Sequence, residues 1–359
     1  MASPGDRGSR TRAWALVALF LATAGVVTLS LRRSLPGGGA EELVDAKLER
    51  FEEIRDECTV LFLGSSRVHR GFVPEVFDRA MAERGLATRS FNFGAPGSRA
   101  FEVRHVLERV VELEPRSVAF VFVDPEGIAV LRDERNHLAR QVIDWHDPEA
   151  TLLLSRFIAD MEMPPRAKLD ALLPHWQSCA YNLANIGRSQ RWIDASLGTL
   201  RTPERLKNML GAGLDGYAPL GVEGEELSRR GERFQKKRRD AYLAELEAFK
   251  SLEIREGPPS EFALKLYGDI VERVEALGAT PIFVTQPALY LQDDLIRAAE
   301  RGEVRQLVRF DSPVRFPELY DPDHRYDATH LNDEGARIFT EMLAREFAAR
   351  IERGELRAR

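Results

Sequence analysis

Short apolar segments alternate with helix-like segments in the first and last thirds of the folded part of the chain. The run from Cys58 to Gly64, CTVLFLG, is continuously apolar, which is typical of a strand buried on both faces of a parallel sheet. Further strands are predicted at 89–93, 118–123, 281–285 and 307–310, and helices at 73–84, 98–113, 261–277 and 333–351. Strands alternating with helices predict right-handed βαβ units, and so an α/β domain with a parallel sheet over residues 58–359.

The alternation stops after Asp124-Pro125-Glu126-Gly127 and resumes only at the predicted helix 261–277. The intervening segment is rich in Arg, Leu, Trp and Pro, and it is too long for a bare loop in a compact domain. We therefore expect a long, mostly helical insertion at about 128–258.

A basic run lies inside this predicted insertion, from Arg229 to Asp240, with the sequence RRGERFQKKRRD. It has two interpretations. The run contacts an anionic polymer or lipid head groups, or it is a solvated helix face with acidic residues interspersed, the commoner outcome for such runs.

The N-terminal part of the chain holds an uncharged apolar run from Ala13 to Leu31, long enough to span a bilayer. A cleaved signal peptide is the alternative, but its apolar core is usually shorter and ends in a small-x-small site, whereas this run ends LSLRR. We expect an uncleaved signal anchor at 13–31, a cytoplasmic tail at 1–12, and a linker with a membrane-proximal helix at 32–57. The basic tail, followed by Glu41-Glu42, favours a cytoplasmic N-terminus. The prediction is a single-pass membrane protein whose main domain is extracytoplasmic, in the periplasm or at the cell surface.

Composition narrows the classes of partner. The formal net charge of −6 argues against a nucleic-acid binder, because phosphate neutralisation needs a basic footprint. The two cysteines, Cys58 and Cys179, either form one disulfide in an oxidising compartment or remain two separate buried thiols. The seven histidines show no metal-ligand spacing, and no GxGxxG follows the first strand, so neither a metal nor a nucleotide cofactor is expected.

Candidate catalytic side chains occur in loops that leave the predicted strands. Ser66 follows the first strand in Gly-Ser-Ser-Arg, and Gly94 follows the second strand in NFGAPG. Asp327 and His330 lie together in DATH, directly before Asn332, which is placed to cap the last helix. Because parallel sheets bind ligands at the carboxyl ends of their strands, these loops predict one site. An aspartate that orients a histidine, which takes a proton from a serine, is the arrangement of nucleophilic acyl transfer.

Two other histidines compete for the role of base. Asp321 and His324 have the same Asp-x-x-His spacing, but the helix cap follows His330 directly, so we prefer Asp327 and His330. His69, three residues after Ser66, is a weaker alternative that we expect to face solvent near a helix start.

These blocks, GSS at 64–66, NFGAPG at 92–97 and DATH at 327–330, resemble the SGNH (GDSL-type) hydrolase superfamily. The resemblance implies a three-layer α/β/α, flavodoxin-like fold. It also implies that Ser66 is the nucleophile and an oxyanion donor, Gly94 a second oxyanion donor, His330 the base and Asp327 its orienting residue. The HLNDEGA continuation is similar to membrane-anchored, extracytoplasmic members that include the alginate O-acetylation and teichoic-acid D-alanylation factors. The resemblance covers the α/β core, not the insertion or the anchor.

The chain departs from the family pattern in two places. Ser65 stands where an aspartate usually precedes the nucleophile, a variant similar to the extracytoplasmic branch. The third block should offer an asparagine after the third strand, but here Asp124 follows it, which leaves one oxyanion donor unassigned. The asparagines that could replace it from the insertion are Asn136, Asn182 and Asn185, although a surface polar role is expected for each.

The resulting expectation is an extracytoplasmic esterase or O-acyltransferase that acts through an acyl-serine on acyl groups of a cell-envelope polysaccharide or similar glycan. Expected partners are an acylated glycan or other ester substrate, the membrane, and a membrane-bound acyl-transfer protein. The alternative is a noncatalytic SGNH-like scaffold or polymer-binding component of an envelope assembly, motivated by the missing asparagine and the large insertion.

Overall fold

A computed structural model gives the structure of the protein. It describes residues 4–34, 39–125, 140–186, 197, 203–220 and 224–356. These form two compact units along the chain: unit 1 comprises Met1–Glu41 and Leu131–Arg201, and unit 2 comprises Glu42–Val130 and Thr202–Arg359. The segment predicted as one insertion at 128–258 is therefore divided, with its second half belonging to unit 2.

Unit 2 is built on a five-stranded parallel sheet in the order β2-β1-β3-β4-β5. The strands are β1 (Val60–Leu63), β2 (Ser90–Asn92), β3 (Phe120–Val123), β4 (Thr280–Thr285) and β5 (Leu307–Arg309). All residues of the central β1 and β3 are buried, which explains their continuous apolar sequences. The predicted α/β class with a parallel sheet is confirmed. The order of strands reverses between β1 and β3, the place where such sheets bind ligands.

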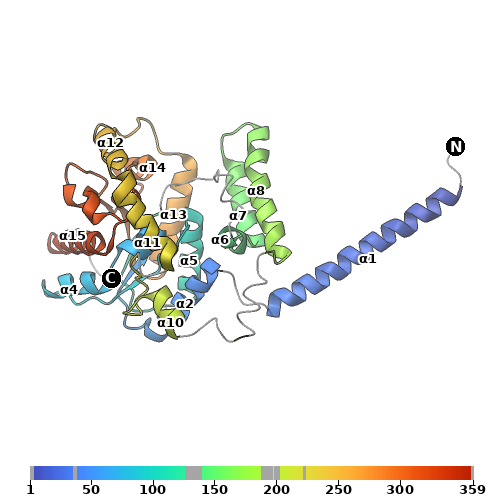
Figure 1. Ribbon diagram of the computed structural model, residues 1–359, viewed down its shortest axis with the longest axis horizontal. Coiled ribbons are helices and arrows are strands. Elements are labelled where there is room, and N and C mark those ends of the chain that lie inside the picture. The colour runs from blue at the N-terminus through green and yellow to red at the C-terminus, as the bar shows by residue number, and fades with distance from the viewer. Residues whose placement is uncertain are drawn as a thin grey trace. The chain divides into compact units, whose positions relative to one another are not determined.

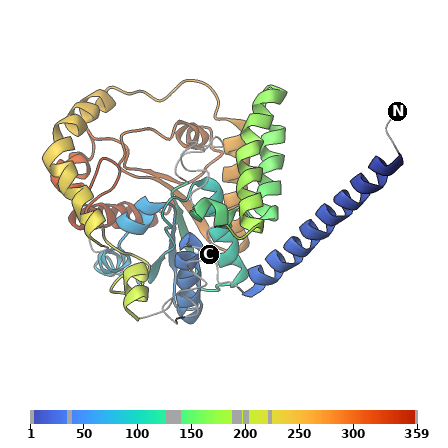
Figure 2. The same cartoon turned by 45° about the vertical axis from the view of Figure 1, so that its right-hand side comes forward.

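Helices cover both faces of this sheet (Figures 1 and 2). On one face α4 (Pro74–Ala82) packs against α15 (Asp333–Glu352), and on the other α5 (Ala100–Glu112) packs against α13 (Glu261–Ala276). Because side chains alternate along a strand, successive strand residues serve the two faces. Phe62 and Phe122 belong to the hydrophobic core that includes Phe347 of α15.

The remaining elements of unit 2 connect or flank these layers. They are α2 (Gly39–Ile54, whose first residues belong to unit 1), α3 (Ser66–Gly71), α10 (Pro203–Leu210), α11 (Gly224–Arg233), a π-helical turn η1 (Phe234–Arg238), α12 (Arg239–Lys250), α14 (Asp293–Glu300), and the 3-10 turns η2 (Pro317–Tyr320) and η3 (Pro322–His324). The basic run 229–240 thus forms the end of α11, all of η1 and the start of α12. Within this run Phe234 is buried, Gln235 donates a hydrogen bond to Pro322, and Arg239 pairs with Asp323, so part of the run faces unit 2 and not water.

The secondary-structure elements in the described part of unit 1 are all helices. Unit 1 contains α1 (Pro4–Ser34), α6 (Arg140–Trp145), α7 (Pro148–Asp160) and α8 (Pro165–Leu183). The apolar run Ala13–Leu31 lies within α1. Over the described residues, no helix has both the length and the apolar character required to cross a membrane. The predicted linker lies partly outside the described residues, at 35–38.

The two cysteines are both buried free thiols, Cys58 in unit 2 and Cys179 in unit 1. Of the two alternatives that the sequence left open, the structure therefore has the separate thiols. Burial raises the pKa of Cys58 to about 12, so this side chain stays protonated and behaves as a small apolar group.

Candidate active site

Ser66 lies at the carboxyl end of β1, as the first residue of α3. The preceding Ser65 is the N-cap of this helix, and its hydroxyl accepts a hydrogen bond from the Arg67 amide at 3.2 Å. The sharp turn from strand to helix leaves Ser66 partly exposed, while Ser65 and Arg67 on either side are buried. The loop thus presents the Ser66 hydroxyl at the sheet edge where the sequence predicted it.

His330 and Asp327 come from the loop before α15, and they complete a hydrogen-bonded chain with Ser66. Ser66 Oγ lies 2.9 Å from His330 Nε2, and His330 Nδ1 lies 3.0 Å from Asp327 Oδ1. The loop is closed by a bridge between Arg325 and Leu331, and Asn332 caps α15 by accepting a hydrogen bond from Gly335 N at 2.8 Å. The structure therefore brings together three residues that are separated by up to 264 positions in the sequence.

The carboxylate of Asp327 is held ionised. Burial opposes its charge, but the hydrogen bond and charge of His330, together with hydrogen bonds from the amide and hydroxyl of Thr329, lower the pKa of Asp327 below its usual range. Since this carboxylate accepts a hydrogen bond from Nδ1, we assign the Nδ1–H tautomer to neutral His330. That tautomer leaves the Nε2 lone pair facing the Ser66 hydroxyl, as a general base requires.

The two competing histidines have other surroundings. His324 Nδ1 lies 2.7 Å from the carbonyl of Glu318, and Asp321 caps the short turn η3. His69 was predicted to face solvent, and that prediction is wrong: only 1% of its surface is exposed. It lies on α3, whose buried face packs beneath the loop after β2, so the helical position was correctly predicted but not its orientation.

His69 belongs to a buried polar cluster that the sequence did not indicate. Its Nδ1 lies 3.0 Å from Lys47 Nζ and 3.0 Å from the carbonyl of Gly216, and Lys47 Nζ also donates to the carbonyl of Gly94 at 2.6 Å. Burial, aided by the charges of Lys47 and Arg70, lowers the pKa of His69. Lys47 lies in the charged helix α2, on the same face as the buried Val44 and Phe51, and this helical spacing is the sequence signal that could have indicated its burial.

The loop after β2 lies beside the Ser66 turn, because Ala95 N donates to Gly64 O at 2.9 Å. Gly94 packs so closely that a Cβ would lie 2.1 Å from His69 N. The Gly94 amide, the predicted oxyanion donor, donates to Asn92 Oδ1 at 2.8 Å. Asn92 in turn donates to the carbonyls of Val68 and Phe72, so its side chain fastens the loop to α3.

Another amide of this loop was not considered from the sequence. Ala95 N and Ser98 N both donate within the protein, and Pro96 has no N–H. Among the described residues, the Gly97 amide takes part in no hydrogen bond, and Gly97 has a φ of 75°, which favours glycine. The candidate donors at this edge are thus the amides of Ser66, at the start of α3, and of Gly97.

Asp124 occupies the position after β3 where the resemblance called for asparagine. It is buried and accepts hydrogen bonds from Gln286 Nε2 at 2.5 Å and Gln292 Nε2 at 2.9 Å, with Arg67 Nη2 at 3.3 Å. A carboxylate cannot donate to an oxyanion, so Asp124 instead ties the residue after Ser66 to the β4 side of the sheet. The sequence feature that could have indicated this role is the acidic residue directly after the apolar segment 118–123.

The three asparagines proposed as substitutes do not have a common setting. Asn182 is fully buried in unit 1 and donates to the Ile143 carbonyl at 2.8 Å, so the expectation of a surface role was wrong for it. Asn185 donates to the Thr28 carbonyl within the same unit, at 2.8 Å. Asn136 lies outside the described residues. Hydrogen bonds inside unit 1 explain the two described asparagines without a role in the site.

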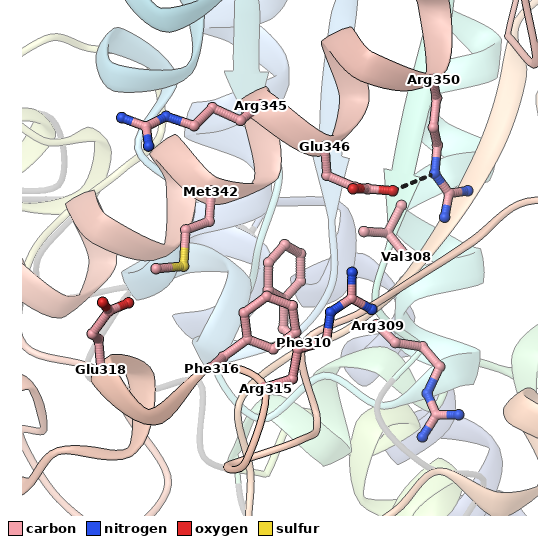
Figure 3. A pocket seen from close by; sticks show the side chains of 10 residues that line it. All are labelled: Val308, Arg309, Phe310, Arg315, Phe316, Glu318, Met342, Arg345, Glu346 and Arg350. Atoms are coloured by element: carbon pink, nitrogen blue, oxygen red, sulfur yellow. Dashed lines mark hydrogen bonds and ion pairs between the residues drawn. The ribbon is translucent and has the colours of Figure 1, made fainter. Parts of the chain in front are cut away.

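Two cavities of unit 2 differ in their relation to this site. One, of about 380 Å³, is bordered by Asp327 and Thr329 and by α11, η1 and α12. The other, of about 310 Å³, lies between β5 and α15 and contains none of the triad residues (Figure 3). Across the described residues, no group of three potential metal-binding side chains is found.

Comparison with protein-family models and with curated proteins finds no match for this chain. The geometry of the site is therefore the evidence on which its function is argued.

Proposed function

We propose that the protein is a serine-dependent ester hydrolase or O-acyltransferase of SGNH type. The observation that carries this proposal is the continuous chain from Ser66 Oγ through His330 to Asp327, with distances of 2.9 and 3.0 Å. Its position at the β1/β3 reversal of the sheet is where α/β proteins bind ligands.

In the proposed reaction, Ser66 Oγ attacks the carbonyl carbon of an ester while His330 Nε2 takes the hydroxyl proton. Asp327 stabilises the resulting imidazolium through Nδ1. His330 then gives the proton to the departing alkoxide, which leaves an acyl group on Ser66. Water or a sugar hydroxyl attacks this acyl-serine, His330 takes the proton from the attacking oxygen, and Ser66 is released with its proton restored.

The carbonyl oxygen becomes negative in each tetrahedral intermediate, and backbone amides must bind it. Ser66 N, at the first position of α3, and Gly97 N are the donors that the proposal uses. Loss of one oxyanion donor typically lowers the rate by about 100-fold to 1000-fold. The carboxylate at Asp124, in place of a neutral donor, is the observation that favours the second candidate, a noncatalytic scaffold.

The proposed location is extracytoplasmic, with acyl groups of a cell-envelope glycan as substrates. It rests on the Ala13–Leu31 run and its flanking arginines, and on several large apolar side chains of α1 that are exposed, among them Trp14, Leu16, Leu19 and Phe20. Exposed apolar surface of this kind needs lipid or a protein partner to cover it.

The test is labelling of the full-length chain by a fluorophosphonate probe, which reacts only with an activated serine. We expect labelling of the natural chain and none of Ser66→Ala. His330→Ala should lose labelling, while His324→Ala, which removes a histidine of equal Asp-x-x-His spacing, should retain it. Absence of labelling in the natural chain, or its survival in Ser66→Ala, favours the scaffold and contradicts catalysis.

A further inference from the structure

The basic segment of unit 2 packs directly onto the catalytic loop. Gln235 Nε2 donates to the carbonyls of Pro322 and Arg325 at 2.7 and 3.1 Å, and Tyr242 Oη donates to the carbonyl of Tyr320 at 2.9 Å. Arg239 forms an ion pair with Asp323. These contacts hold α11, η1 and α12 against the loop that carries Asp327 and His330, so arginines of this segment have defined positions relative to Asp327.

Two local features permit this close packing. A Cβ on Gly231 would lie 2.8 Å from the ring of Tyr326, so glycine is needed where α11 meets the catalytic loop. The π-helical turn at Phe234–Arg238 changes the direction in which the following side chains leave the helix, and Phe234 is buried against Tyr242. Such turns interrupt α-helices frequently at functional sites.

The cavity between this segment and the catalytic loop has an excess of positive charge. It is lined by Arg230, Arg233, Arg238, Glu245 and Asp327 among its charged residues. Arg230 Nη2 lies 2.7 Å from Asp327 Oδ2. Within the described part of the chain, Arg233 and Arg238 form no ion pair, although a carboxylate, Glu245, also borders the cavity.

The second cavity provides a contrast in the same unit. Four arginines line it, and three of them have acidic partners: Arg350 pairs with Glu346 at 3.1 Å, as Figure 3 shows, Arg309 pairs with Asp311 at 3.0 Å, and Arg345 pairs with Glu341. The fourth, Arg315, stacks on the ring of Phe316. A guanidinium group that already has a carboxylate partner attracts a further anion less than one without such a partner. The cavity beside the triad is different, because two of its three guanidinium groups have no carboxylate partner in the described structure.

We propose that the cavity beside Asp327 binds an anionic group, a carboxylate or a phosphate, of the ester substrate. The proposal rests on the proposed function and specifies its substrate class as an ester that carries negative charge. Guanidinium groups bind both anions through paired hydrogen bonds. Arg233 and Arg238 supply these donors, and Asp327 joins the cavity to His330 and Ser66 through one chain of hydrogen bonds.

The ion pair of Arg230 with Asp327 has a role in the same proposal. The side chain of Arg230 is 56% exposed, so it can exchange its contact with Asp327 for one with a bound anion. Asp327 would keep its hydrogen bonds from Thr329 and His330 when this happens. Binding of the anion thus leaves the triad geometry in place while it removes a positive charge from the carboxylate that supports His330.

Titration calorimetry on full-length Ser66→Ala protein tests the site without turnover. The probes are hexagalacturonate, inorganic phosphate and the neutral maltohexaose. We expect binding of at least one anionic probe, about tenfold or more tighter than that of maltohexaose, and loss of this preference in Arg233→Gln/Arg238→Gln. The matched control is Lys236→Gln/Lys237→Gln, which removes the same charge from η1 at residues that do not line the cavity.

The outcomes separate this inference from the proposed function. Equal weakening in the two double variants would show nonspecific attraction to a basic segment and overturn the inference, as would equal binding of the anionic and neutral probes. Fluorophosphonate labelling of Ser66 without anion binding overturns the inference and leaves the proposed function standing. Anion binding without labelling overturns the assignment of the anion as part of an ester substrate. Binding by hexagalacturonate and not phosphate supports a sugar carboxylate, and the reverse supports a phosphate.

Discussion

Lys47 is a charged residue on the apolar face of α2, beside Val44, Leu48 and Phe51. It is fully buried, and its amine contacts Gly94 O and His69 Nδ1 rather than a carboxylate. Burial, with a smaller effect from the charge of Arg70, lowers the pKa of Lys47, while Asp215 opposes the shift. The amine thus positions the loop that begins at Gly94, at the cost of an unfavourable environment for its charge.

We predict that Lys47→Met lowers kcat for ester hydrolysis more than it changes KM, because the Gly94 carbonyl loses its donor and the loop shifts.

The same variant tests the lowered pKa of Lys47. Since this pKa is lower in the folded protein than in the unfolded chain, the unfolded chain binds more protons at pH values between the two, and the stability that depends on Lys47 rises with pH. The stability of the natural chain relative to Lys47→Met should therefore increase from pH 7 to pH 9, by at most about 1.4 kcal/mol per pH unit. Urea unfolding at both pH values measures this difference. If the stability difference between the two proteins decreased from pH 7 to pH 9, this would contradict the conclusion that burial lowers the pKa of Lys47.

At the scale of elements, the site depends on the close approach of the β2 loop to α3. A Cβ at Gly94 would lie 2.1 Å from His69 N and 2.7 Å from His69 Cα, and backbone atoms of a helix cannot move aside cheaply. Gly268, in the middle of the exposed side of α13, has no atom within 4 Å of the position of its Cβ. Substitution of glycine by alanine at the two sites therefore distinguishes the cost of overpacking from the gain in helix propensity.

We expect Gly94→Ala to lower the free energy of unfolding by about 3 kcal/mol through overpacking. Gly268→Ala should raise it by about 0.5–1 kcal/mol, because alanine loses less backbone entropy in a helix. Urea denaturation of both variants checks the pair, and similar stabilities would contradict the close packing of Gly94 on α3.

At the scale of the whole molecule, the chain forms two compact units, and every residue of the candidate site belongs to unit 2. Phe347 of α15 is fully buried there and contacts Phe77, Phe120 and Phe122. Phe157 of α7 is a comparably buried phenylalanine in unit 1, with 6% of its surface exposed. Phe347 belongs to the hydrophobic core of unit 2, and Phe157 lies in unit 1.

Truncation of these two residues tests the independence of the units. Phe347→Ala should lower the free energy of unfolding of unit 2 by about 3–5 kcal/mol and reduce fluorophosphonate labelling of Ser66 at elevated temperature. Phe157→Ala should destabilise unit 1 by a similar amount and leave the temperature profile of labelling unchanged. Labelling measured across a temperature series distinguishes them. Equal effects on labelling would mean that the units unfold together.

The sequence by itself determined the features that depend on local pattern. The continuous apolar runs of β1 and β3 required burial on both faces, and their alternation with helices required parallel pairing. The turn after β1 placed Ser66 at a helix start, and the position of Asn332 predicted the cap of the last helix. These inferences succeeded because helix caps and strand ends are set by neighbouring residues.

Only the tertiary structure decided the contacts between distant segments. No local pattern relates the residues that these contacts join. They include the order of the strands, the contact of Lys47 with His69, and the pairing of Arg230 with Asp327. A charged side chain on the polar face of a helix, such as Arg230, has the same local sequence whether it faces water or the loop that carries Asp327. Which of these it faces depends on how the helices pack, and that is settled by the burial of apolar surface over the whole unit.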